Sequence, residues 1–248
     1  MFNVKATVVD ILGDQEKFPC HAGHKIGDEV IFDGESYTGR LCPDLWPEVT
    51  AKAAALHAAG PRHMEPLNYY PFWYVCVSQA DPNKKIYDGR GFKNIFEGYN
   101  IPKYHMAQLA GGSKVFSWPP PSEKIVRPVT VICPDFRTAV VVELEAFDVS
   151  AGGFSLPYYR RQMVILDRVL KKQGIEVDKI LNEFSKEEQL DIYPPLSPIE
   201  VQVLVEELEL VGHLQIKDGK AYVTKKGETK VADFKKGLTV VEKEALKL

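Results

Sequence analysis

The N-terminal part of the chain and the region around residue 140 alternate between apolar and polar positions. Four segments have the period-two pattern or the β-branched content of strands, at residues 4–12, 29–32, 129–133 and 139–147. Between them, residues 47–59 form an alanine-rich helical pattern that ends at Gly60. Strands gathered around one helix predict a small mixed domain of the α+β class.

After residue 150 the apolar positions recur with a helical period instead. The predicted elements are helices at residues 158–172, 177–184, 198–211 and about 226–236, and strands at 214–217 and 221–224. Ser197-Pro198-Ile199-Glu200 is a capping box with proline at the first helical position. Asp218-Gly219 is a typical hairpin turn between the two strands. Helix, capped helix, two-stranded wing and helix predict a winged helix-turn-helix domain.

Small residues separate the two patterns. The stretch at residues 148–157 contains Gly152-Gly153 and Pro157 and lies between an apolar strand and a long helix. We therefore predict an N-terminal domain at 1–150 and a C-terminal domain at 151–248. Within the first, residues 61–127 are dense in aromatic side chains, which favours a large ordered insertion over a linker.

Composition narrows the function classes. Of 248 residues, 45% are hydrophobic and 26% charged, typical of a soluble globular protein. A net charge of −3 without a polybasic arm offers no electrostatic footprint for nucleic acid or an anionic membrane, so we expect neither as a partner. No run approaches the ~18 apolar residues that a membrane span needs, and the first residues lack a secretory pattern. We expect a cytoplasmic protein with reduced cysteines.

The two best-defined C-terminal helices point to protein contacts. The capped helix carries Glu200, Glu206, Glu207 and Glu209 but no Lys or Arg, so DNA phosphates would be repelled. Dimerisation or packing on the first domain is the favoured alternative use of this domain. The helix at 158–172 has a broad apolar arc, and we expect its surplus face to dock on the first domain or on a second copy in a homodimer.

The candidate chemistry is concentrated in the first half. All four cysteines and five of the six histidines precede residue 134. One loop brings Cys20, His21 and His24 together, and the pattern Cys-Pro-Asp occurs twice, at residues 42–44 and 133–135. Thiolate and imidazole are natural ligands of zinc or iron, and an aspartate could orient a ligand or accept a proton.

Each of these signals has a structural alternative. A free cysteine is often only a small buried hydrophobic residue, which is the favoured interpretation of Cys76, and a loop histidine is often merely solvated. The chain contains no CxxC or HExxH motif, so a metal site would have to assemble from distant segments. An iron–sulfur cluster is less favoured because the usual close cysteine spacing is absent.

The cysteine-bearing segments also resemble a known family. Its features here are Cys20 with Gly23-His24-Lys25, Cys42 followed by Trp46-Pro47, and the stretch 131–135 ending in Cys-Pro-Asp. In these features the chain is similar to small bacterial and archaeal repeat proteins that are about one such unit long and carry cysteines in the same three places. The resemblance covers roughly 1–60 and 128–147 and supports the cysteine grouping, but it implies no reaction.

These observations predict a metal-dependent enzyme of hydrolase or lyase type that acts on a small cyclic or aromatic molecule. Zinc or iron would be held by Cys20, Cys42 and Cys133, with His24 or Asp135 completing or supporting the site. The candidates for proton transfer are His21, His24 and Asp135, and those for a substrate pocket are Tyr70, Trp73, Arg90 and Trp118. The alternative is a non-enzymatic regulator that binds a metal or ligand, or a subunit of a larger complex.

Overall fold

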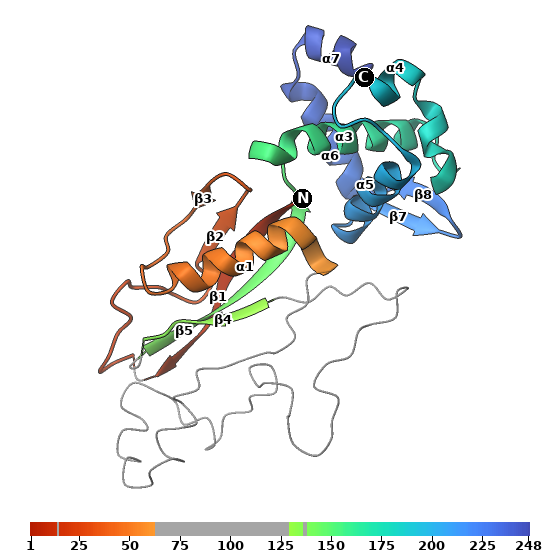
Figure 1. Ribbon diagram of the computed structural model, residues 1–248. Coiled ribbons are helices and arrows are strands. Elements are labelled where there is room, and N and C mark those ends of the chain that lie inside the picture. The colour runs from red at the N-terminus through yellow and green to blue at the C-terminus, as the bar shows by residue number, and fades with distance from the viewer. Residues whose placement is uncertain (14, 63–128, 136–137) are drawn as a thin grey trace. The chain divides into compact units, whose positions relative to one another are not determined.

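A computed structural model of the chain describes residues 1–13, 15–62, 129–135 and 138–248 (Figure 1). The chain divides into two compact units. The first contains Val4–Phe32 and Ser36–Ala146, and the second contains Met1–Asn3, Asp33–Glu35 and Phe147–Leu248. The second unit thus includes short pieces of the N-terminal region besides the predicted C-terminal domain. Both helices and antiparallel strand pairs are present, so the protein belongs to the α+β class.

The first unit is built on a five-stranded sheet in the order β3-β2-β1-β5-β4. Its strands are β1 (Phe2–Gly13), β2 (Glu29–Phe32), β3 (Tyr37–Thr38), β4 (Val129–Ile132) and β5 (Thr138–Val149). Residues of β1 alternate between buried and half-buried from Phe2 to Val8, so that one face of the strand meets the core. The two-residue strand β3 was not predicted, because two residues carry no periodicity.

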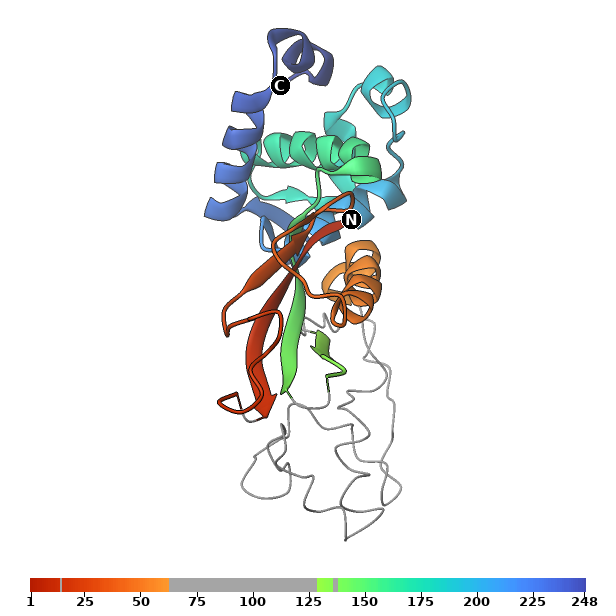
Figure 2. The same cartoon turned by 90° about the vertical axis from the view of Figure 1, so that its left-hand side faces the viewer.

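The helix α1 (Trp46–Ala59) covers one face of this sheet, as Figure 2 shows. Its buried residues Val49, Ala53 and Leu56 lie one helical turn apart and join the core with Val4 and Val142 from the sheet. The helix stops at Gly60, whose φ of +66° is a conformation that other residues rarely adopt. The short 3₁₀ helix η1 (Gly60–Arg62) follows.

The second unit contains several helices and a three-stranded sheet in the order β6-β8-β7. Its elements are η3 (Gly153–Ser155), α3 (Leu156–Lys171), β6 (Ile175–Glu176), η4 (Val177–Glu183), α4 (Lys186–Leu190), α5 (Pro198–Leu210), β7 (Leu214–Lys217), β8 (Lys220–Val223), α6 (Lys225–Gly237) and α7 (Val240–Leu246). Within the described residues, no helix is long and apolar enough to cross a membrane.

The helix α3 is the centre of the second unit. Each residue from 161 to 167 is buried, and the helix contacts α5, α6, β8 and η4. The apolar arc, which predicted docking on the first domain or on a second copy, is therefore covered by elements of its own unit. The arc gives no support to a homodimer, which remains only a prediction from the sequence.

The hairpin β7–β8 follows its turn signal. Lys217 pairs with Lys220, and between them Asp218 and Gly219 have φ values of +50° and +73°. Two successive positive φ values are the geometry of a type I′ turn, for which Asp-Gly is a favoured sequence. Local backbone preference was thus sufficient to predict this element.

The helix type at residues 177–183 and two of the helix caps differ from the prediction. Residues 177–183 form a 3₁₀ helix rather than the predicted α-helix. Ser197 caps α5 by accepting the backbone N–H of Glu200 at 3.1 Å. Complete capping boxes occur instead at Ser185 with Glu188 and at Thr239 with Glu242, and they open the short helices α4 and α7. Both pairs are visible in the sequence, but neither is followed by a long apolar run.

We predict that the two glycines of α6 respond in opposite ways to alanine. A Cβ at Gly227 would lie 2.3 Å from the carbonyl oxygen of His213, whereas one at Gly237 would meet nothing within 4 Å. Helix propensity alone favours alanine by about 1 kcal/mol at both positions. The clash should reverse the sign at Gly227→Ala, which should lower the free energy of unfolding by about 1–3 kcal/mol, while Gly237→Ala should not lower it. Urea unfolding of both variants measures this, and equal effects would contradict the close approach.

Candidate functional site

The loop between β1 and β2 positions Cys20 and the two neighbouring histidines. Its far end is held to β1 by two backbone hydrogen bonds, from Gly27 to the Val8 carbonyl at 2.8 Å and from Val8 to the Asp28 carbonyl at 2.9 Å. Within the loop, the N–H of Gly23 donates to the Cys20 carbonyl at 2.8 Å, and Gly23 has a φ of +65°. The tight turn fixes the spacing between Cys20 and His24.

Cys42 and Cys133 enter the same core from different elements. Cys42 lies four residues before α1 begins at Trp46, and its carbonyl accepts the N–H of Trp46 at 2.9 Å. Cys133 follows β4, and its N–H donates to the Val140 carbonyl on β5 at 2.8 Å. Both side chains are buried in the core cluster of the first unit, and the partly buried Cys20 packs against that cluster. All three cysteines carry free thiols.

The side chain of His21 joins the three cysteine segments. Its Nε2 lies 3.6 Å from a carboxylate oxygen of Asp44, and its Nδ1 lies 3.7 Å from one of Asp135. Asp44 and Asp135 are the last residues of the two Cys-Pro-Asp motifs, and His21 directly follows Cys20. Segments that are far apart in the sequence therefore meet at one half-exposed imidazole.

The arrangement of His21 suits proton chemistry better than metal binding. The two carboxylates face opposite nitrogens of the ring, so they cannot join the imidazole in chelating one ion. They can instead hold the ring in one orientation. Asp135 was predicted from the sequence as a proton-transfer residue. Asp44 was recognised only as part of the repeated motif.

Burial makes Cys133 a weak acid. Removal from water raises the pKa of its thiol to about 11, and the neighbouring Cys42 and Asp135 act in the same direction, while backbone hydrogen bonds oppose them. The group is therefore a neutral thiol near pH 7 and a poor nucleophile by itself.

His24 differs from His21 in burial and in partners. Only 1% of its side chain is exposed, and within the part of the chain that the structure describes neither ring nitrogen has a hydrogen-bond partner. Its Nδ1 lies 3.5 Å from a carboxylate oxygen of Asp28, within ion-pair distance but without hydrogen-bond geometry. The backbone N–H of Lys25 donates to the same carboxylate oxygen at 3.0 Å and lowers the pKa of Asp28, with a smaller contribution from the imidazole of His24.

The described residues thus bring part of the predicted site together. Cys20, Cys42 and Cys133 belong to converging segments, where the half-exposed His21 lies beside the largely buried Asp135. Among the described side chains, no three from His, Cys, Asp and Glu are already arranged to hold a metal ion. The predicted substrate-pocket residues Tyr70, Trp73, Arg90 and Trp118, as well as Cys76, lie outside the described residues.

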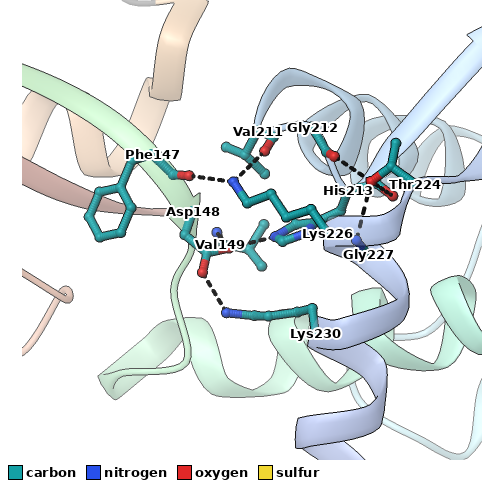
Figure 3. A network of polar contacts seen from close by, with 10 residues as sticks. All are labelled: Phe147, Asp148, Val149, Val211, Gly212, His213, Thr224, Lys226, Gly227 and Lys230. Atoms are coloured by element: carbon teal, nitrogen blue, oxygen red, sulfur yellow. Dashed lines mark hydrogen bonds and ion pairs between the residues drawn. The ribbon is translucent and has the colours of Figure 1, made fainter.

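A second polar cluster lies in the other unit, centred on Asp148 (Figure 3). One carboxylate oxygen of Asp148 lies 2.6 Å from Nε2 of His213, and the other lies 2.6 Å from the ammonium of Lys230. Burial opposes the charged form of Asp148, but these two partners outweigh it and lower its pKa to about 2.

The neighbouring contacts show what this second cluster does. The ammonium of Lys226 donates to the carbonyls of Phe147 at 3.1 Å and Val211 at 2.7 Å, and Thr224 donates to the Gly212 carbonyl at 2.7 Å (Figure 3). The cluster therefore fastens the end of β5 to the turn after α5 and to the start of α6. His213 is 1% exposed, so its imidazole is shielded from solvent and we assign the cluster a structural role.

Comparison of the chain with protein-family models, with curated proteins and with solved structures finds no match. Functional inference therefore depends on the residues and their geometry.

We predict that Asp148 contributes stability that acid removes. Its pKa is lower in the folded protein than in the unfolded chain, so the contribution is present above the unfolded value of 3.8 and is lost as the pH falls through about 2. The loss should amount to about 2 kcal/mol in the free energy of unfolding. Asp148→Asn should remove this part of the pH dependence, and urea unfolding between pH 5 and pH 2 (roughly the span of both pKa values) measures it. Parallel pH profiles of wild type and variant would contradict the assignment.

Proposed function

We propose that the first unit binds a transition metal through the thiols of Cys20, Cys42 and Cys133 and acts as a metal-dependent hydrolase or lyase. The observation that carries this proposal is the contact of His21 with both Asp44 and Asp135. It unites the three cysteine segments and adds an acid–base group beside them. Because no described group of three ligands is preassembled, binding would draw the thiols toward one another.

The donor set favours zinc or iron. Thiolates are soft ligands that select these ions over magnesium or calcium. A bound ion of this kind polarises a carbonyl or lowers the pKa of a water molecule. His21 would move the proton, because its ring is half exposed and both of its nitrogens face carboxylates. Asp44 and Asp135 would hold the ring in position.

The substrate assignment rests on the sequence alone. A small cyclic or aromatic molecule would suit the cluster of Tyr70, Trp73 and Trp118, with Arg90 as a charged contact. This part of the proposal concerns residues outside those that the structure describes.

Burial of the thiols favours a second candidate, a non-enzymatic protein with a structural metal. Cys42 and Cys133 are only 4% and 3% exposed. Structural metal sites are closed, whereas catalytic sites keep an open coordination position. In this case a chelator should unfold the first unit, whereas removal of a catalytic metal should leave the fold intact and abolish activity.

We further propose that the second unit is a winged-helix domain that binds protein and not DNA. Helix α5 occupies the position along the chain that a recognition helix has in a winged helix-turn-helix, and the hairpin β7–β8 would be the wing. On α5, Ile199 is 74% exposed and Val203 is 37% exposed. These exposed apolar side chains suit a protein partner, and the carboxylate of Glu206 on the same helix repels phosphates.

The first test is metal content. Purified wild type should contain about one zinc or iron ion per chain, and Cys42→Ser and Cys133→Ser should each weaken the affinity by more than the 10–100-fold typical of a lost outer-shell contact. Cys76→Ser is the matched control, because Cys76 is the one cysteine that is not a proposed ligand. This variant should keep the metal. Protein that binds no zinc or iron, even when reduced and reloaded, would overturn the proposal. Detection of four acid-labile sulfides per chain would instead show that the cysteines hold an iron–sulfur cluster.

The second test concerns DNA. Because α5 presents carboxylates, fluorescence anisotropy should detect no association with random duplex DNA at physiological salt. Affinity that rises steeply as salt is lowered would show that phosphates are bound and would contradict the proposal.

A further inference from the structure

The loop that follows Cys20 presents alternate residues to the interior. Cys20 and Ala22 pack against the core cluster that contains Cys42 and Cys133, and His24 is buried, whereas His21 and Gly23 are exposed. The alternation places Cys20 and His24 on the inner side of one short segment and His21 on its outer side. The two histidines therefore have different environments although they are three residues apart.

The burial of His24 leaves one of its ring nitrogens unsatisfied. Its side chain is 1% exposed, Nδ1 faces a carboxylate oxygen of Asp28 at 3.5 Å, and Nε2 has no hydrogen-bond partner among the described residues. A buried polar atom without a partner costs roughly 1–3 kcal/mol. A buried imidazole with an unsatisfied nitrogen is suited to bind a metal ion directly through that nitrogen.

We infer that His24 is the fourth ligand of the metal centre, bound through Nε2 and completing a three-cysteine, one-histidine site. This inference rests on the proposed function of the three thiols. Zinc with four such ligands is tetrahedral and closed, so the inference favours the second candidate above, a structural metal, over a catalytic one. The same loop then supplies two of the four ligands, with three residues between them, which is a common local spacing in zinc sites.

The position of Asp28 agrees with this assignment. Its carboxylate lies 3.5 Å from Nδ1 of His24 and is held in place by the backbone N–H of Lys25 at 3.0 Å. A carboxylate beside one ring nitrogen favours the proton there and leaves the other nitrogen free to bind a metal. Asp28 is therefore a positioning residue for His24.

Neither His21 nor Asp135 fits the fourth position as well. Both nitrogens of His21 already face carboxylates, and half of its side chain is exposed. Asp135 has a carboxylate oxygen 3.7 Å from that same ring. The structure thus separates a buried imidazole, His24, from a half-exposed one, His21.

Cobalt(II) substitution of the full-length protein tests the inference. Wild type should show thiolate-to-cobalt absorption and the intense visible bands of a tetrahedral site. His24→Ala should weaken cobalt affinity by about 100-fold or more and reduce the visible bands, since loss of an outer-shell partner alone costs 10–100-fold. His24→Cys should restore a tetrahedral spectrum with stronger thiolate absorption. His21→Ala, on the same loop, is the matched control and should leave affinity and spectrum unchanged.

A second variant keeps the inference testable if His24→Ala does not fold. Asp28→Asn changes a half-buried residue, and it should weaken cobalt binding about 10-fold without changing the type of spectrum. If the His24→Ala protein folds and binds cobalt unchanged, the assignment of His24 is wrong, although the thiol centre stands. If His24→Ala does not fold, unchanged cobalt binding by Asp28→Asn leads to the same conclusion. Wild type that binds no cobalt would overturn the proposed function itself.

Discussion

The alternation of buried side chains along β1 is the constraint on which the first unit depends. Val4, Ala6 and Val8 face the core that α1 covers, and a shift of one residue would turn all of them outward. The same alignment positions the candidate chemistry, because the loop that carries Cys20 is hydrogen-bonded to β1 at Val8. A register fixed by hydrophobic burial therefore also fixes the position of the cysteine loop.

Buried polar groups in the two units differ in the partners that they have. In the second unit, the carboxylate of Asp148 contacts both a histidine and a lysine, and these partners favour its charged form despite burial. In the first unit, burial raises the pKa of the Cys133 thiol, and Nε2 of the buried His24 has no hydrogen-bond partner among the described residues. The Asp148 carboxylate is thus paired on both oxygens within the protein, whereas Nε2 of His24 would gain from a cation.

Local signals explain which elements could be predicted. The strand β2, the hairpin turn at Asp218-Gly219 and the helix stop at Gly60 follow from preferences within a few residues, and the structure contains each of them. The strands β3 and β6 have two residues each and exist only through pairing with a neighbour. The breadth of the apolar arc on α3 was visible in the sequence, but which elements cover it was not.

The sequence by itself determined the α+β class, most element positions and the residue types able to bind a metal or move a proton. It also showed the repeated Cys-Pro-Asp pattern, because that is a local feature. Only the tertiary structure decided that Asp44 and Asp135 meet at His21, and that His24 is buried while His21 is exposed. The physical reason is that contacts between distant segments depend on strand order and on packing around α1, and neither leaves a pattern in neighbouring residues.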